Sequence, residues 1–208
     1  MSYVSGTVAS RKPIQRMNAS LKVIDSFVIP ADKLRDIALT LDFGTVTWAG
    51  QPFHGIAEAC LEVLWDRVKA VRELGHLKVI PNADFFRLGT AATPPTTYIH
   101  ADLDMGEWAG VLYLNTPEQR YGGTAFWRHK ATGWDRLPDG PVPEETLKML
   151  TEDGMDESKW EMESKSGMQF NRFITYPTRM FHSRHPNHIP AETKEDGRLV
   201  WCCFYDLK

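Results

Sequence analysis

The chain has 208 residues, a formal net charge of -3 and a pI near 6.2. This length suits one domain with a sizeable core, and the charge lacks the basic excess that binding to nucleic acid favours. No segment has the apolar run that a signal peptide or a membrane span needs. Three cysteines, Cys60, Cys202 and Cys203, are too few for a disulfide framework. We expect a cytoplasmic protein with neither a membrane nor a nucleic-acid partner.

The N-terminal third predicts a polar arm and then a helical support region. Residues 1–20 are polar and unpatterned, and we expect a flexible arm there, followed by a single domain over 21–208. A strand is predicted from Leu21 to Ile29, and a helix from Pro30 to about Thr40. Apolar residues at intervals of three and four predict an amphipathic helix over about 55–74. These two helices need a sheet to cover, so we expect residues 21–75 to form a helical support region that packs on the sheet of the remaining chain.

From residue 76 onward the pattern is typical of an antiparallel barrel or sandwich. Short aromatic and β-branched runs alternate with Gly, Pro and Asn. A polar insertion of about 131–158, with a short helix near Glu144 to Leu150, interrupts this core and is either a lid or a surface decoration. The predicted fold class is mainly β with flanking helices. Strands are expected near 77–81, 84–88, 97–103, 109–115, 123–128, 159–164, 168–176 and 198–206.

The pair His100 and Asp102 is the strongest chemical signal in the sequence. Alternate residues of an extended strand face one side, so Tyr98, His100 and Asp102 are predicted to project together. Two imidazoles and a carboxylate suit Fe(II) and leave coordination positions free for substrate-derived ligands and O2. The second imidazole is expected from His182, which follows an apolar run, with His185 as the alternative.

Arg198 is the candidate for binding an organic acid. It opens a strand-like run and shares a face with the apolar residues of that run. An arginine that enters an apolar row requires an anion, and its planar fork suits a carboxylate. Tyr98 is a candidate donor of a hydroxyl hydrogen bond to the same acid, and the alternative is a core tyrosine whose hydroxyl is satisfied within the protein. The alternative is an exposed Arg198 that pairs with Glu195 or Asp196.

The chain resembles the 2-oxoglutarate- and Fe(II)-dependent oxygenase superfamily over about residues 21–206, and is most similar to its prolyl-4-hydroxylase-type branch. This resemblance implies a double-stranded β-helix, also called a distorted jelly roll. It also implies Fe(II) held by His100, Asp102 and His182, with 2-oxoglutarate held by Arg198 and Tyr98. The segments that carry the resemblance are Val23-Ile24-Asp25-Ser26-Phe27-Val28-Ile29-Pro30, Phe86-Arg87-Leu88-Gly89, Tyr98-Ile99-His100-Ala101-Asp102, Leu112-Tyr113-Leu114-Asn115, Gly122-Gly123-Thr124-Ala125-Phe126 and His182-Ser183-Arg184-His185-Pro186.

The activity implied is oxidation of an unactivated C–H bond in a small molecule, an amino acid or a peptide side chain. The reaction would consume O2 and 2-oxoglutarate and release succinate and CO2. Because Asp102 occupies the carboxylate position, no position is left for a halide, and hydroxylation is favoured over halogenation. Two alternatives stay open from the sequence: a cupin-like metalloenzyme that needs no 2-oxoglutarate, and a non-catalytic jelly-roll binding module.

Overall fold

The computed structural model describes residues 21–48, 50–58, 61–72, 77–94, 98–119 and 121–207, with the backbone alone over 77–83. Antiparallel strands dominate this part of the chain, which confirms the predicted fold class. In chain order the elements are β1 (Lys22–Ile24), α1 (Ala31–Thr40), β2 (Gly44–Trp48), β3 (Gln51–Glu58), α2 (Glu62–Arg72), β4 (Leu77–Gly89), β5 (Trp108–Tyr113), β6 (Gly123–His129), α3 (Glu144–Asp153), the 3-10 helix η2 (Glu157–Lys159), β7 (Trp160–Gly167), β8 (Arg172–Pro177), β9 (His182–His185) and β10 (Arg198–Leu207).

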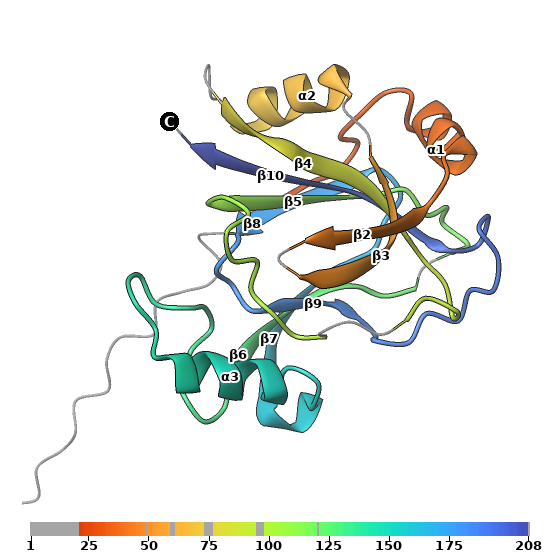
Figure 1. The fold of residues 1–208 in the computed structure, drawn as a ribbon. Helices are drawn as coiled ribbons and strands as arrows, with labels where there is room; N and C mark the ends of the chain where they lie inside the picture. The colour runs from red at the N-terminus through yellow and green to blue at the C-terminus, as the bar shows by residue number, and fades with distance from the viewer. Residues whose placement is uncertain are drawn as a thin grey trace, which may run out of the picture.

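Two antiparallel sheets form the framework of the molecule (Figure 1). The larger sheet has the strand order β1-β8-β5-β10-β4-β3-β2, and the smaller has the order β7-β6-β9. Strands far apart in the sequence therefore lie side by side, as in a jelly roll. Apolar side chains of both sheets share one core cluster, which includes Val111 and Val200 from the larger sheet and Phe126 from the smaller. The sheets therefore pack face to face.

The two N-terminal helices cover the outer face of the larger sheet (Figure 1). Leu64, Trp65 and Val68 of α2 are buried at intervals that place them on one side of the helix. The Trp65 ring packs edge-on against Trp201 of β10, with 5.8 Å between ring centroids. The larger sheet is thus apolar on both faces, and its inner face is free to line a site. Within the described residues, no helix combines the length and apolar character needed to cross a bilayer.

The predicted helix over 55–74 is wrong at its N-terminal end, because β3 continues to Glu58 and α2 begins only at Glu62. Ile56, Ala57 and Glu58 pair with β4, so tertiary pairing overrides the apolar periodicity. Gly55 allows this pairing. Its φ is +69°, and a Cβ there would lie 2.0 Å from the Leu88 carbonyl oxygen.

Other differences concern short or irregular segments. The strands expected near 77–81 and 84–88 form one strand, β4, and the strand expected near 97–103 is absent over its described part, 98–103. β2 and β9 were not predicted, because β2 is a largely exposed edge strand and β9 is four residues long and polar. The expected arm, 1–20, lies outside the described residues.

Gly55→Ala is expected to lower the free energy of unfolding by more than about 2 kcal/mol, since it combines an unfavourable φ with a clash against backbone. Gly133→Ala is the matched control, because Gly133 also has a positive φ, +72°, but no atom within 4 Å of its added Cβ. The free energy of unfolding of that control should fall by only about 1 kcal/mol. Urea unfolding measures both values, and equal losses would contradict the close packing of β3 on β4.

Candidate metal centre

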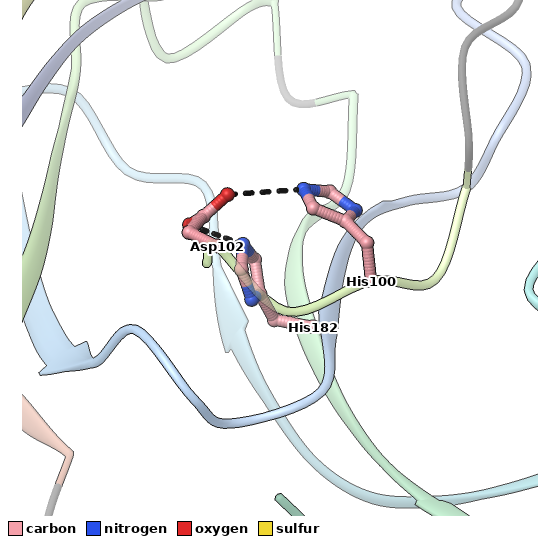
Figure 2. Close-up of side chains that lie close together, drawn as sticks. All are labelled: His100, Asp102 and His182. Atoms are coloured by element: carbon pink, nitrogen blue, oxygen red, sulfur yellow. Dashed lines mark ion pairs between the residues drawn. The ribbon is translucent and has the colours of Figure 1, made fainter. Parts of the chain in front are cut away.

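His100, Asp102 and His182 lie close together, with both imidazoles turned toward the Asp102 carboxylate (Figure 2). The His100 Nε2 is 3.5 Å from Asp102 Oδ1, and the His182 Nε2 is 3.3 Å from Asp102 Oδ2. Facial ligands of one metal ion, with bonds of about 2.1 Å, are roughly 3 Å apart. The three side chains therefore fit a single divalent ion with small adjustments.

Backbone hydrogen bonds hold these ligands in place. The His100 N–H donates to the His182 carbonyl oxygen at 3.0 Å, and the His182 N–H donates to the His100 carbonyl oxygen at 2.9 Å. The Asp102 N–H donates to the Thr178 carbonyl oxygen at 2.9 Å, and a turn follows in which Asp104 has a positive φ. His100 and Asp102 thus come together through one isolated bridge and a bend, not through the alternation of a regular strand.

The orientation of both imidazoles favours metal binding. The Nδ1 of His100 lies 3.1 Å from the Tyr98 carbonyl oxygen, and that of His182 lies 2.9 Å from the Met180 carbonyl oxygen. Because a carbonyl oxygen only accepts, each Nδ1 carries a proton, and each Nε2 is the nitrogen that faces Asp102 and would bind a metal ion. This is the arrangement in which a second hydrogen bond fixes the tautomer of a metal-binding histidine.

The charges at the centre are coupled through Asp102. Burial alone would raise the pKa of Asp102, but the charge of His182 and the hydrogen bond from His100 lower it well below the usual value. Burial would lower the pKa of His182, yet the neighbouring carboxylate raises it above its usual value. Asp102 is therefore ionised, and a bound cation would take the place of the proton that it attracts to His182.

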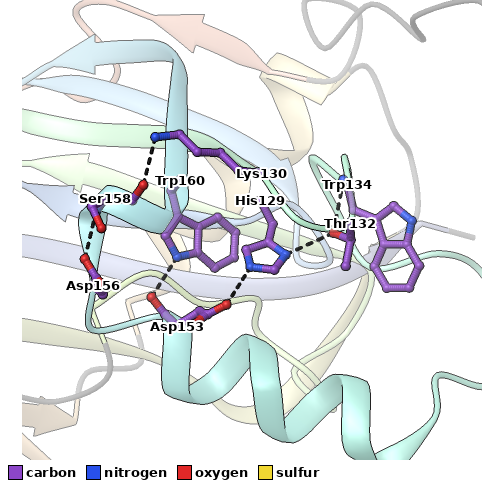
Figure 3. Close-up of polar contacts among 8 residues, drawn as sticks. All are labelled: His129, Lys130, Thr132, Trp134, Asp153, Asp156, Ser158 and Trp160. Carbon is purple, nitrogen blue, oxygen red and sulfur yellow. Dashed lines mark hydrogen bonds and ion pairs between the residues drawn. The ribbon is translucent and has the colours of Figure 1, made fainter.

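The segment that carries His100 is supported by the insertion of 131–158. The Ile99 N–H donates to the Gly154 carbonyl oxygen at 2.9 Å, directly after α3. The insertion is itself anchored by His129, which is fully buried at the end of β6 (Figure 3). His129 Nε2 is 2.9 Å from Asp153 Oδ2, and its Nδ1 is 3.1 Å from Thr132 Oγ1. The insertion is therefore part of the framework that positions the metal ligands.

The three candidate ligands open into a cavity of about 900 Å³ between the sheets. The β2–β3 hairpin forms part of its wall and contributes Val46, Trp48, Phe53 and Ile56. A volume of this size suits a small molecule or an extended side chain.

Arg198 lines the same cavity from the first position of β10. It pairs with neither Glu195 nor Asp196, and its Nε has no hydrogen-bond partner among the described residues. Burial lowers the pKa of the guanidinium, which nevertheless stays charged. The group is thus an unbalanced cation beside the candidate metal ligands.

Tyr98 has a different partner from the one that the sequence suggested. Its hydroxyl is hydrogen-bonded to His185 Nδ1 at 3.0 Å, and burial raises its pKa to about 12. His185, the alternative third ligand, is therefore engaged by Tyr98 and is not in the metal group. The tyrosine beside Arg198 is Tyr113, whose ring centroid lies 5.9 Å from the guanidinium carbon.

Sequence reasoning did not assign Arg87 and Arg184, which also line the cavity. The signal for Arg87 was present, because it is a charged residue inside an apolar strand, as Arg198 is. Arg184 follows His182 by two residues and so shares its face of β9.

The chain belongs to the family described as a family of unknown function (DUF6445), which matches residues 7–205. No curated protein matches it in sequence. The membership gives the residues above no established activity.

Similar solved structures share the fold. One is a prolyl hydroxylase in complex with a hypoxia inducible factor oxygen degradation domain peptide fragment from Trichoplax adhaerens. It has a TM-score of 0.55 and 12% identity, with 89% of this chain and 83% of that chain covered. Another is AviO1 from Streptomyces viridochromogenes Tue57, with a TM-score of 0.54 and 11% identity over 93% of this chain and 96% of that chain. This chain therefore has the jelly-roll fold of such oxygenases.

Substitution of a candidate ligand should remove metal binding. We expect Asp102→Ala and His182→Ala to lower the affinity for Mn(II) by roughly 100-fold or more, since each removes one of three ligands. His185→Ala is the control, because this histidine binds Tyr98, and its Mn(II) affinity should stay within about threefold of the wild type. Electron paramagnetic resonance of free Mn(II) measures the affinity. Equal losses in all three variants would place the metal elsewhere.

His129→Ala should loosen the insertion. It removes two hydrogen bonds and the packing on Trp160, 4.7 Å away between centroids, so the free energy of unfolding should fall by about 2–4 kcal/mol. Lys148→Ala, which removes an exposed ion pair with Glu152 on α3, should change it by less than about 0.5 kcal/mol. Denaturant unfolding gives these values, and limited proteolysis should cut the His129 variant first within 131–158. A His129 variant as stable as the Lys148 variant would contradict this anchoring role.

Proposed function

We propose that the protein is an Fe(II)- and 2-oxoglutarate-dependent dioxygenase that hydroxylates an unactivated C–H bond of a small molecule, an amino acid or a peptide side chain. The observation that carries the proposal is the placement of an unbalanced arginine, Arg198, in the cavity into which His100, Asp102 and His182 open. A metal group alone fits many metalloenzymes. Three candidate metal ligands with Arg198 nearby suit a co-substrate that has a keto acid at one end, to bind the metal, and a carboxylate at the other end, to bind the arginine.

Each residue has a defined task in this proposal. The two Nε2 atoms and the Asp102 carboxylate would hold the metal ion at the cavity. Arg198 holds the distal carboxylate of 2-oxoglutarate by a charge-assisted pair. Bound Fe(II) and 2-oxoglutarate then supply the oxidising chemistry, in which O2 is consumed, succinate and CO2 are released and one oxygen atom enters the substrate.

The surrounding residues position these groups. Tyr98 orders His185 and, through its carbonyl oxygen, the ring of His100. The Tyr176 ring packs against His182 with 4.8 Å between centroids and restricts its rotation. A cytoplasmic location and the absence of a nucleic-acid partner remain expectations from composition.

Binding of 2-oxoglutarate to the Fe(II)-loaded protein without O2 should produce a weak visible charge-transfer band. Arg198→Met should weaken this binding by roughly 30-fold or more, because it removes a charge-assisted pair from a site with little water. Arg198→Lys keeps the charge but loses the planar, two-pronged guanidinium. Its affinity for 2-oxoglutarate should therefore fall between those of the wild type and Arg198→Met. Titration of the band measures the dissociation constant.

Arg67→Met is the matched control, since Arg67 lies on α2, outside the cavity, and donates to the Phe27 carbonyl oxygen. It should bind 2-oxoglutarate as the wild type does. Iron binding without any band would favour a cupin-like metalloenzyme. Failure to bind iron would favour a non-catalytic binding module.

A further inference from the structure

Three arginines line the cavity beside the candidate metal ligands: Arg87 of β4, Arg198 of β10 and Arg184 of β9. In the β4–β10 register, Arg87 is opposite Val200 and Arg198 is opposite Gly89. Arg87 and Arg198 therefore lie diagonally on the inner face of the larger sheet. Arg184 comes from the smaller sheet, across the cavity.

No carboxylate balances these charges among the described residues. Arg184 donates from Nε and Nη2 to the backbone and side-chain oxygens of Asn187, both at 3.0 Å, which fixes its guanidinium without neutralising it. Arg87 forms no hydrogen bond or ion pair within the described part of the chain. Glu58 of the adjacent strand β3 also lines the cavity, but it is exposed and pairs with none of the three arginines. Outside the described residues the chain has a single acidic side chain, Glu73.

The arginines repel one another. Burial, followed by the charges of Arg87 and Arg198, lowers the pKa of Arg184 to about 10. Like charges in a poorly solvated site weaken the folded state, so their clustering indicates that a bound anion compensates them.

The charge balance of the proposed site shows which arginines need a further anion, and this step rests on the proposed function. A divalent metal is balanced by Asp102 and by the metal-bound carboxylate of 2-oxoglutarate. Arg198 is balanced by the other carboxylate. Arg87 and Arg184 then remain without a counter-charge.

We propose that the substrate to be oxidised is an amphipathic acid whose acidic group binds between Arg87 and Arg184 and whose apolar body rests on the β2–β3 hairpin. Ile56 of that hairpin is paired directly with Arg87, so the apolar wall begins beside the arginine. Val46, Trp48 and Phe53 extend this wall away from the arginines, and Trp48 is 44% exposed at its edge.

The test uses Mn(II)-loaded full-length protein saturated with 2-oxoglutarate, in which no oxidation occurs. Calorimetry compares two acids, octanoate and 4-phenylbutyrate, with their primary amides, which have the same body and no charge. Each acid is expected to bind roughly tenfold or more tightly than its amide. Arg87→Met should remove this preference and leave the affinity for 2-oxoglutarate within about twofold, whereas Arg198→Met should weaken 2-oxoglutarate binding.

A stability measurement separates a binding role for Arg87 from a structural one. If Arg87 serves to bind a ligand, Arg87→Met removes its repulsion from the other two arginines. The urea midpoint of the ligand-free protein should then rise. A lower midpoint would overturn the proposal, since it would show that Arg87 supports the fold.

Two binding results would also overturn it. One is that the acids bind no better than their amides, or that none binds in the millimolar range. The other is that Arg87→Met weakens the binding of 2-oxoglutarate as strongly as Arg198→Met does, which would show that Arg87 binds the co-substrate. If 2-oxoglutarate does not bind the wild type at all, the proposed function fails, and the comparison of acids with amides on Mn(II)-loaded protein alone still decides this inference.

Discussion

The candidate site depends on the paired backbone hydrogen bonds between His100 and His182. These two bonds join an irregular segment before β5 to the first residue of β9, and so bring together ligands from distant parts of the chain. Asp102 then lies between the two imidazoles and attracts positive charge. Because both Nδ1 atoms are engaged by carbonyl oxygens, the geometry leaves a set of donors suited to a metal ion.

The layers around this bridge have separate tasks. The larger sheet, covered by α1 and α2, presents Arg87 and Arg198 on its inner face. The smaller sheet presents His182 and Arg184, and the insertion packed on its outer side holds the segment of His100. The candidate metal ligands and the three arginines therefore face one cavity from both sheets. Such an arrangement places a cation and two acidic groups within reach of one another.

The sequence predicted the grouping of His100, Asp102 and His182 better than the backbone that carries them. The spacing of His100 and Asp102, an apolar run before His182 and a charge in the apolar strand of Arg198 are local signals. The bridge that positions His100 pairs it with the distant His182, and such a contact leaves no periodic pattern in the sequence. The same reason explains the error at Gly55, where pairing with β4 outweighs an apolar repeat. Arg87 was visible as a charged residue in an apolar strand, but its lack of a partner is evident only from the structure.

Oxygen uptake by the Fe(II)-loaded protein, with and without 2-oxoglutarate, tests the central claim most directly. We expect that uptake requires 2-oxoglutarate, that about one succinate forms for each O2 consumed, and that Asp102→Ala abolishes both. Iron-dependent oxygen uptake that is indifferent to 2-oxoglutarate would contradict it, because Arg198 would then have no co-substrate to hold.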